Sequence, residues 1–162
     1  MFLQDWQSAS RCGKEKGKRE YKAHMEKHPV ILFDGVCNLC NASVNFVIDR
    51  DDDAIFRFGA LQSDSGARML AEHGLEPGRL ESIVLIDDGA VYVASDAALR
   101  IARRLGGALK LLWPFRFVPR FLRDAVYNWI ARNRYRWFGR QESCRLPTPD
   151  LTERFIGGTL RH

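Results

Sequence analysis

Apolar and polar positions divide the chain into three parts. Residues 1–28 contain few apolar positions and show no helical face before Tyr21, so they are predicted to form a basic, flexible arm that ends before Pro29. Residues 29–108 carry the periodicities of a folded core, and residues 109–162 are aromatic and arginine-rich. The length suits one domain with extra chain at both ends.

The core pattern predicts four strands and three helices. The segment VILFD at 30–34 is apolar on both faces, which is typical of a buried central strand. From Cys37 the apolar period becomes that of a helix, and the polar run RDDD ends it. Further strands are predicted at 54–61, 82–86 and 90–94, with a tight turn at Asp88 and Gly89 and helices at 63–75 and from 95 to the glycines at 106 and 107.

The helix ends carry recognisable signals. Ser63 or Ser65 is expected to cap the second helix, and Gly74 to terminate it. Ser95 or Asp96 is expected to cap the third. These signals fix the element order as strand, helix, strand, helix, hairpin, helix. The crossover requires parallel strands and the hairpin antiparallel ones, so the fold class is α/β, with the mixed sheet and helix order of thioredoxin.

Residues 109–162 are predicted to add helices and a tail that pack on this core. Phe121, Leu122, Val126, Trp129 and Ile130 belong to an apolar stripe at helical spacing, flanked by arginines. One interpretation is a helix pair that covers the sheet, with arginine stems along its rim. The other is a surface that binds a membrane, nucleic acid or an acidic partner.

Composition and charge narrow the classes of protein. Hydrophobic residues make up 46% of the chain and charged residues 28%, which is too apolar for a disordered protein. A net charge of +5 permits an anionic surface as a partner without requiring one. Because the start shows no secretory signal and no apolar run is long enough to span a bilayer, a cytoplasmic location is expected. Cysteines there are usually reduced, and a close pair is more often catalytic or metal-binding than structural.

Cys37 and Cys40 form such a pair, two residues apart at a strand-to-helix junction. The unpaired N–H groups and positive dipole end of a helix stabilise a thiolate, which is the reactive form. Cys37 is therefore the expected attacking thiol, and Cys40, one turn further, the resolving thiol. A zinc site completed by His24 and His28, or by Cys12 and Cys144, is an alternative, and chemically inert cysteines are another.

Asp34 precedes Cys37 by three positions and allows two compatible interpretations. Its carboxylate can form an Asx turn or cap, which is a structural role. It can also carry a proton to or from a thiol during disulfide exchange. A negative charge beside Cys37 would raise the pKa of that thiol and oppose the helix dipole.

These residues resemble the signature of the DCC family of thiol–disulfide oxidoreductases, named for Asp-x-x-Cys-x-x-Cys. FDGVCNLC supplies the three letters as Asp34, Cys37 and Cys40, and the resemblance continues through NASVNFVIDRD, FRFGALQSDSGARML, SIVLIDDGAVYVASDAALRIARRLGG and YRWFGRQESCRLP. It implies a thioredoxin-like fold and disulfide exchange by these residues, with no organic cofactor. The chain departs from thioredoxin in carrying Glu81 and Ser82, where thioredoxin has a cis-proline, so a different substrate groove and redox potential are expected.

The predicted function is thus thiol–disulfide exchange with a disulfide- or dithiol-bearing protein or a small thiol, supported by an unidentified electron donor. The alternative is a non-catalytic thioredoxin-like module that docks on a membrane surface or a protein through its C-terminal helices; nucleic acid is not an expected partner. Cys144 is interpreted as a packing residue rather than a relay thiol, and Cys12 as a free thiol in the arm. Residues expected near the pair on grounds of fold alone are Gln62, Ser63, Ser95 and Asp96.

Overall fold

The computed structural model describes residues 28–76, 82–140 and 154–156. Its strands are β1 (Val30–Phe33), β2 (Arg57–Ala60), β3 (Val84–Asp87) and β4 (Ala90–Val93). They form one sheet in the order β2-β1-β3-β4, in which β1 pairs in parallel with β2 and the other neighbours are antiparallel. The mixed, thioredoxin-like sheet predicted from the sequence is confirmed.

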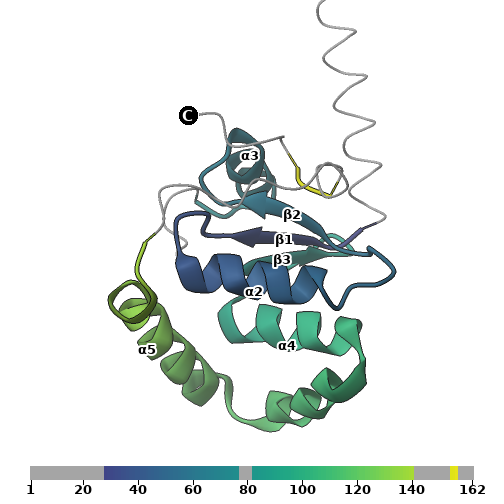
Figure 1. Ribbon diagram of the computed structural model, residues 1–162, viewed down its shortest axis with the longest axis vertical. Helices are drawn as coiled ribbons and strands as arrows, with labels where there is room; N and C mark the ends of the chain where they lie inside the picture. Colours follow the sequence, from purple (N-terminus) through teal and green to yellow (C-terminus); the bar gives the residue numbers. More distant parts are fainter. Residues whose placement is uncertain (1–27, 77–81, 141–153, 157–162) are drawn as a thin grey trace, which may run out of the picture.

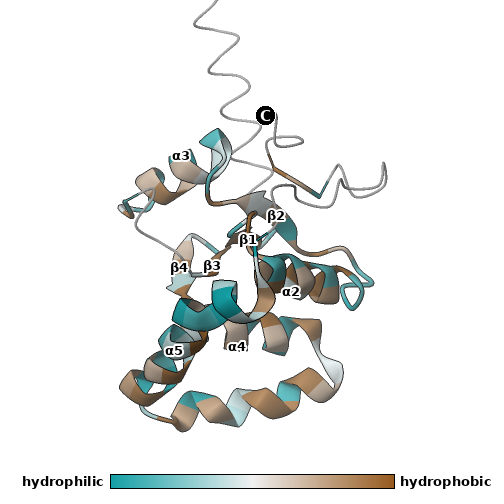
Figure 2. Ribbon diagram, turned by 60° about the vertical axis from the view of Figure 1, so that its left-hand side comes forward, coloured by the Kyte–Doolittle hydropathy of each residue, from teal (hydrophilic) through white to brown (hydrophobic). Residues whose placement is uncertain are grey.

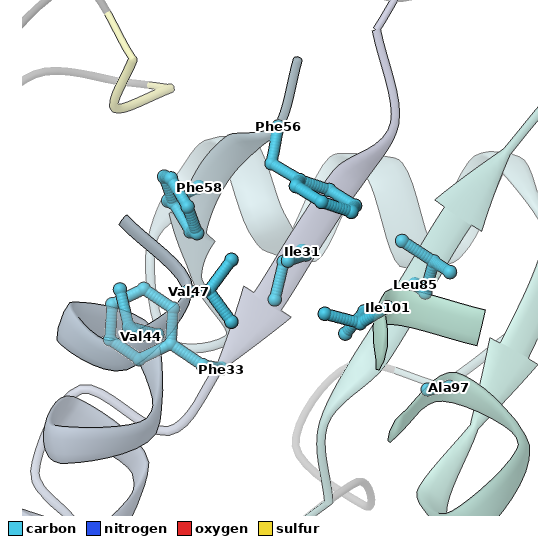
Figure 3. Close-up of a cluster of buried hydrophobic side chains, with 9 residues drawn as sticks. All are labelled: Ile31, Phe33, Val44, Val47, Phe56, Phe58, Leu85, Ala97 and Ile101. Carbon is cyan, nitrogen blue, oxygen red and sulfur yellow. The ribbon is translucent and has the colours of Figure 1, made fainter. Parts of the chain in front are cut away.

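Helices cover both faces of this sheet. Helices α2 (Asn38–Ile48) and α4 (Ala94–Leu105) lie on one face, and α3 (Asp64–Glu72) lies on the other (Figure 1). Side chains of β1 alternate between two apolar clusters, because successive residues of a strand point to opposite faces. Ile31 and Phe33 pack against α2 and α4 (Figure 3), whereas Val30 and Leu32 pack against α3. All four β1 residues are buried, as expected of a central strand.

The predicted helix ends are confirmed in part. The Ser63 hydroxyl accepts a hydrogen bond from the Gly66 N–H at 3.0 Å and caps α3. Gly74 follows the end of α3 with a φ of 72°, a conformation that favours glycine. The expected cap of α4 is wrong: Val93 is the N-cap residue and makes no side-chain cap bond. Ser95 and Asp96 bond instead to Asp124 and Arg123, which joins α4 to the long helix α5 (Arg120–Phe138).

After α4 the chain forms a 3₁₀ helix, η1 (Gly107–Phe117), and a long helix, α5 (Arg120–Phe138). Helix α5 packs mainly against α4 and α2 and stands at the edge of the molecule (Figure 1). Its apolar stripe does not cover the sheet, because Phe121, Leu122, Val126, Trp129 and Ile130 are all exposed. The interpretation of this stripe as a sheet-covering face is therefore wrong.

A short segment near the C-terminus returns to the sheet. Phe58 of β2 donates its N–H to Arg154 and accepts one from Ile156, at 2.8 and 2.7 Å. The Arg154 guanidinium is paired with the buried carboxylate of Asp51, and the Phe155 ring packs on Phe58 with centroids 5.6 Å apart. These contacts cover the outer edge of β2.

Candidate active site

Cys37 lies at the end of the turn that connects β1 to α2. It is the N-cap residue of α2, with extended backbone (φ −92°, ψ 120°), and its carbonyl accepts the first helical hydrogen bond from Asn41 at 2.9 Å. The Cys37 N–H closes a turn on the Asp34 carbonyl at 3.3 Å. Cys37 therefore stands at the N-terminal end of α2, where the first-turn N–H groups have no helical partners, although its side chain makes no cap hydrogen bond. Both thiols of the pair are free.

The two cysteines differ in exposure. Cys37 has 0% of its surface exposed, whereas Cys40 is partly exposed. Residues Phe138–Arg140, called here the strap, lie against the start of α2. Arg140 pairs with Cys37 as an isolated antiparallel bridge, and the Asn38 side-chain N–H donates to the Phe138 carbonyl at 2.8 Å. Gly139, at φ 75°, lets the chain turn between these two contacts.

Loosening the strap is expected to increase the reactivity of Cys37. Asn38→Ala removes the bond to the strap, which contributes about 1 kcal/mol, so the population in which Cys37 is reachable should rise about fivefold. The measurement is the rate of iodoacetamide modification of Cys37 in the folded protein, followed by mass spectrometry. Asn45→Ala, on the same helix, is the control and should leave the rate unchanged. Equal rates in both variants would show that the strap does not limit access.

Cys40 is held as a neutral thiol. Burial, a hydrogen bond to Cys37 and the negative charge of Cys37 together raise the pKa of Cys40 to about 12. Asp34 raises it further, and the positive charge of Arg134 opposes these effects. In the reduced pair, Cys40 therefore keeps its proton at neutral pH and shares it in a hydrogen bond with Cys37.

This asymmetry predicts a pH dependence. The ¹³Cβ resonance of Cys40 should show no thiolate shift through pH 10 and should titrate with a midpoint near 12. Because the folded-state pKa is raised above the ordinary value of 9.0, the stabilisation from the neutral thiol is complete below pH 9 and is lost as the pH rises toward 12. In Cys37→Ser the midpoint should fall, yet stay above 9 because burial remains. A wild-type midpoint near 9 would contradict this description.

Asp34 is the centre of a buried hydrogen-bond network. Only 4% of its surface is exposed. The Asp34 Oδ1 accepts hydrogen bonds from the Val36 N–H at 3.1 Å and from the Gln62 amide at 2.8 Å. The Asp34 Oδ2 accepts hydrogen bonds from the Arg134 guanidinium at 2.8 Å and from the Tyr135 hydroxyl. Burial and the bond to Asp34 raise the pKa of Tyr135, so this hydroxyl remains a donor.

The network confirms part of the sequence interpretation. The bond from Val36 is the predicted Asx turn. Gln62, which was expected near the cysteine pair, donates to Asp34 in the loop that leads to the pair. Proton transfer by Asp34 stays a prediction. Arg134 and Tyr135 were missed as site residues, since they lie about 100 positions further along the chain. One feature of the sequence could have indicated Arg134. It is seven residues from Tyr127, a spacing that places both residues on the same face of a helix.

An apolar cavity of about 500 Å³ lies between α2, α4, η1 and α5, and Cys40 forms part of its wall. Most of the lining is aliphatic or aromatic, and Arg134 and Tyr127 supply polar groups. The Tyr127 hydroxyl accepts the Ile83 N–H at 3.1 Å, just before β3. This backbone N–H lies next to the position of the missing proline and is already bonded within the chain. The cavity therefore places an apolar surface beside Cys40, whereas Cys37 is not among its lining residues.

The other predicted residues lie elsewhere or outside the described part. His28 bonds to the Ile55 carbonyl at 3.2 Å. Among the described residues, no group of three or more His, Cys, Asp or Glu side chains is placed to hold a metal ion. Cys12, His24, Glu81 and Cys144 lie outside the described residues, as does most of the predicted N-terminal arm.

A four-stranded sheet of this topology, with a C-x-x-C pair at the start of the helix after β1, defines a thioredoxin-like protein. The family model of the DCC1-like thiol-disulfide oxidoreductases matches residues 31–140. This chain therefore belongs to the DCC1-like thiol-disulfide oxidoreductase family, as the Asp34, Cys37 and Cys40 signature indicated.

Two relatives are similar over most of the chain. The uncharacterised protein YuxK of Bacillus subtilis is 48% identical over 127 residues, which cover 78% of this chain and 93% of YuxK. A chloroplastic DCC family protein of Arabidopsis thaliana is 43% identical over 122 residues, which cover 75% of this chain and 71% of the plant protein. No solved structure matches.

Proposed function

We propose that the protein exchanges thiols and disulfides through Cys37 and Cys40. The observation that supports this proposal is the placement of the pair: Cys37 occupies the N-cap position of α2, and Cys40 holds its proton one turn away with its pKa raised to about 12. A thiolate beside a protonated partner thiol is the starting state for disulfide exchange. Membership of the family supports the same reaction class.

The proposed reaction balances without a cofactor. The Cys37 thiolate attacks one sulfur of a substrate disulfide, and the other sulfur leaves as a thiolate and takes up a proton. Cys40 then loses its proton and attacks the Cys37 sulfur, which releases the second substrate thiol. Two electrons pass to the substrate, and Cys37 and Cys40 end as a disulfide. A dithiol or two small thiols reverse these steps and restore the pair.

Asp34 and Arg134 act on this pair in different ways. The four donors on Asp34 fix the loop that leads into Cys37, so positioning is its first role in the proposal. Arg134 lowers the pKa of Cys40 by its positive charge, which favours release of the Cys40 proton in the second step. Proton acceptance by Asp34 is a second role, and it would give Asp34→Asn an altered pH profile of the resolving step.

Catalysis should depend on the pair and not on the other two cysteines. The test measures the oxidation of a dithiol peptide by glutathione disulfide, with and without the protein, in wild type and in Cys12→Ser/Cys144→Ser. Both proteins should accelerate the reaction equally. Loss of acceleration in the double variant would assign the chemistry to a thiol outside the pair. No acceleration by either protein would contradict the proposed function.

The alternative function, a non-catalytic module that docks through its C-terminal helices, needs no thiol chemistry. Cys37→Ser would remove exchange and leave docking intact, so the two functions are separable in one variant. Docking would depend on the side chains of the C-terminal helices and not on the two cysteines.

A further inference from the structure

Exposed apolar side chains gather on η1 and α5. Phe117 and Phe121, at the corner between these helices, are 88% and 77% exposed. The rings of Trp129 and Trp137 meet edge to face on α5, with centroids 4.9 Å apart. Figure 2 shows η1 as a hydrophobic segment at the edge of the molecule away from the sheet. The other large apolar residues exposed here are Leu111, Phe115, Leu122, Val126 and Phe138, whereas Leu112 and Ile130, also exposed, line the cavity beside Cys40.

The same face is strongly basic. Between residues 110 and 140 the sequence contains eight basic residues and one acidic residue, Asp124. Asp124 is held by the Ser95 hydroxyl at 2.5 Å and lies 3.4 Å from Arg120. Within the described residues, no carboxylate pairs with the exposed side chains of Lys110, Arg116, Arg132, Arg136 and Arg140.

A polar slot of about 210 Å³ lies beside this face. It is lined by Arg100, Arg116 and Arg123, with Asp96 as its acidic member, and by Tyr92, Leu99 and Trp113. Arg123 is paired with Asp96 at 2.9 Å, whereas Arg100 lies over the Tyr92 ring and Arg116 near the Trp113 ring. Two guanidinium groups therefore remain in excess over carboxylate, in a slot of the size and charge that suit a phosphate group.

We propose that the η1–α5 face docks on a membrane surface that contains anionic phospholipids. Apolar and aromatic side chains at the corner enter the boundary between headgroups and acyl chains, and the arginines contact headgroup phosphates. Charge complementarity selects this partner over a second copy of the chain, since two faces each carrying this excess of arginines would repel. Among the described residues, no helix is long and apolar enough to cross a membrane, so the contact proposed is peripheral.

The test is co-sedimentation of the full chain with vesicles of phosphatidylcholine and phosphatidylglycerol at 7:3, compared with phosphatidylcholine alone. Binding to the anionic vesicles should weaken in high salt and shift tryptophan fluorescence to the blue. Arg132→Gln/Arg136→Gln should weaken it roughly thirtyfold, since each arginine near an anionic surface contributes about fivefold. Phe117→Ser/Phe121→Ser should weaken it at least tenfold, by loss of buried apolar area.

Two control variants show whether a loss of vesicle binding is specific to the η1–α5 face. Arg50→Gln/Arg68→Gln removes the same charge from the turn after α2 and from α3, and should bind as wild type does. Cys37→Ser should also bind normally, which separates docking from the proposed exchange chemistry. No binding to anionic vesicles would overturn the proposal, as would equal losses in the Arg50/Arg68 and Arg132/Arg136 variants. Dimerisation in solution that Phe117→Ser/Phe121→Ser abolishes would instead assign the face to a second copy.

Discussion

Arg134→Met is expected to lower the free energy of unfolding by about 3 kcal/mol. Removing one partner of a buried ion pair costs about 3–5 kcal/mol, because the other charge is left without compensation. The Arg134 side chain is 3% exposed and its partner Asp34 is 4% exposed. The lower end of the range applies because Val36, Gln62 and Tyr135 still donate to Asp34. Urea unfolding monitored by circular dichroism measures the change.

Two variants show whether the loss comes from the uncompensated charge. Arg132→Met removes an exposed arginine from the same helix and should change stability by less than about 0.5 kcal/mol. Asp34→Asn/Arg134→Met leaves no charge behind and should recover part of the lost stability. Equal stabilities of Arg132→Met and Arg134→Met would mean that the pair with Asp34 does not stabilise the fold.

Cys37→Ser is expected to reduce disulfide exchange to the uncatalysed rate, and Cys40→Ser to stop the reaction after its first step. Without Cys37 there is no attacking sulfur at the start of α2. Without Cys40 the mixed disulfide on Cys37 has no resolving thiol and accumulates. Incubation with glutathione disulfide followed by mass spectrometry should therefore find glutathione on Cys37 of Cys40→Ser.

The opposite result for the two variants would make Cys40 the attacking thiol and Cys37 the resolving thiol. Cys40 is the more exposed residue of the two and lies on the wall of the apolar cavity, so it is the alternative site of attack. Glutathione trapped on Cys40 of Cys37→Ser, with none on Cys37 of Cys40→Ser, would make Cys40 the attacking thiol. Circular dichroism of both variants would establish that the fold is intact.

Local patterns in the sequence predicted most of the sheet and the position of the cysteine pair. The run at 30–34 is apolar on both faces because β1 is covered on both faces, and its end sets Cys37 at the start of α2. The Ser63 cap was predictable for a similar reason, since both of its bonds lie within three residues. Such features depend on near neighbours, which a single sequence displays directly.

Long-range contacts were not predictable in this way. The pairing of Arg134 with Asp34 and the bridge between Arg140 and Cys37 join positions about 100 residues apart, and no local pattern specifies them. The prediction that the apolar stripe on α5 covers the sheet was wrong for another reason. The spacing of apolar residues is the same whether a helix face packs on the core or remains on the surface. Ser95 was misassigned as a cap because its hydroxyl bonds to α5 instead.

The most direct test of the central claim is the redox equilibrium of Cys37 and Cys40 in glutathione buffers of graded potential, read by thiol labelling and mass spectrometry. We expect one reversible two-electron transition, localised to this pair and within the range of cellular thiol buffers. A pair that stays reduced across the whole range, or cysteines that react with glutathione independently of one another, would contradict it.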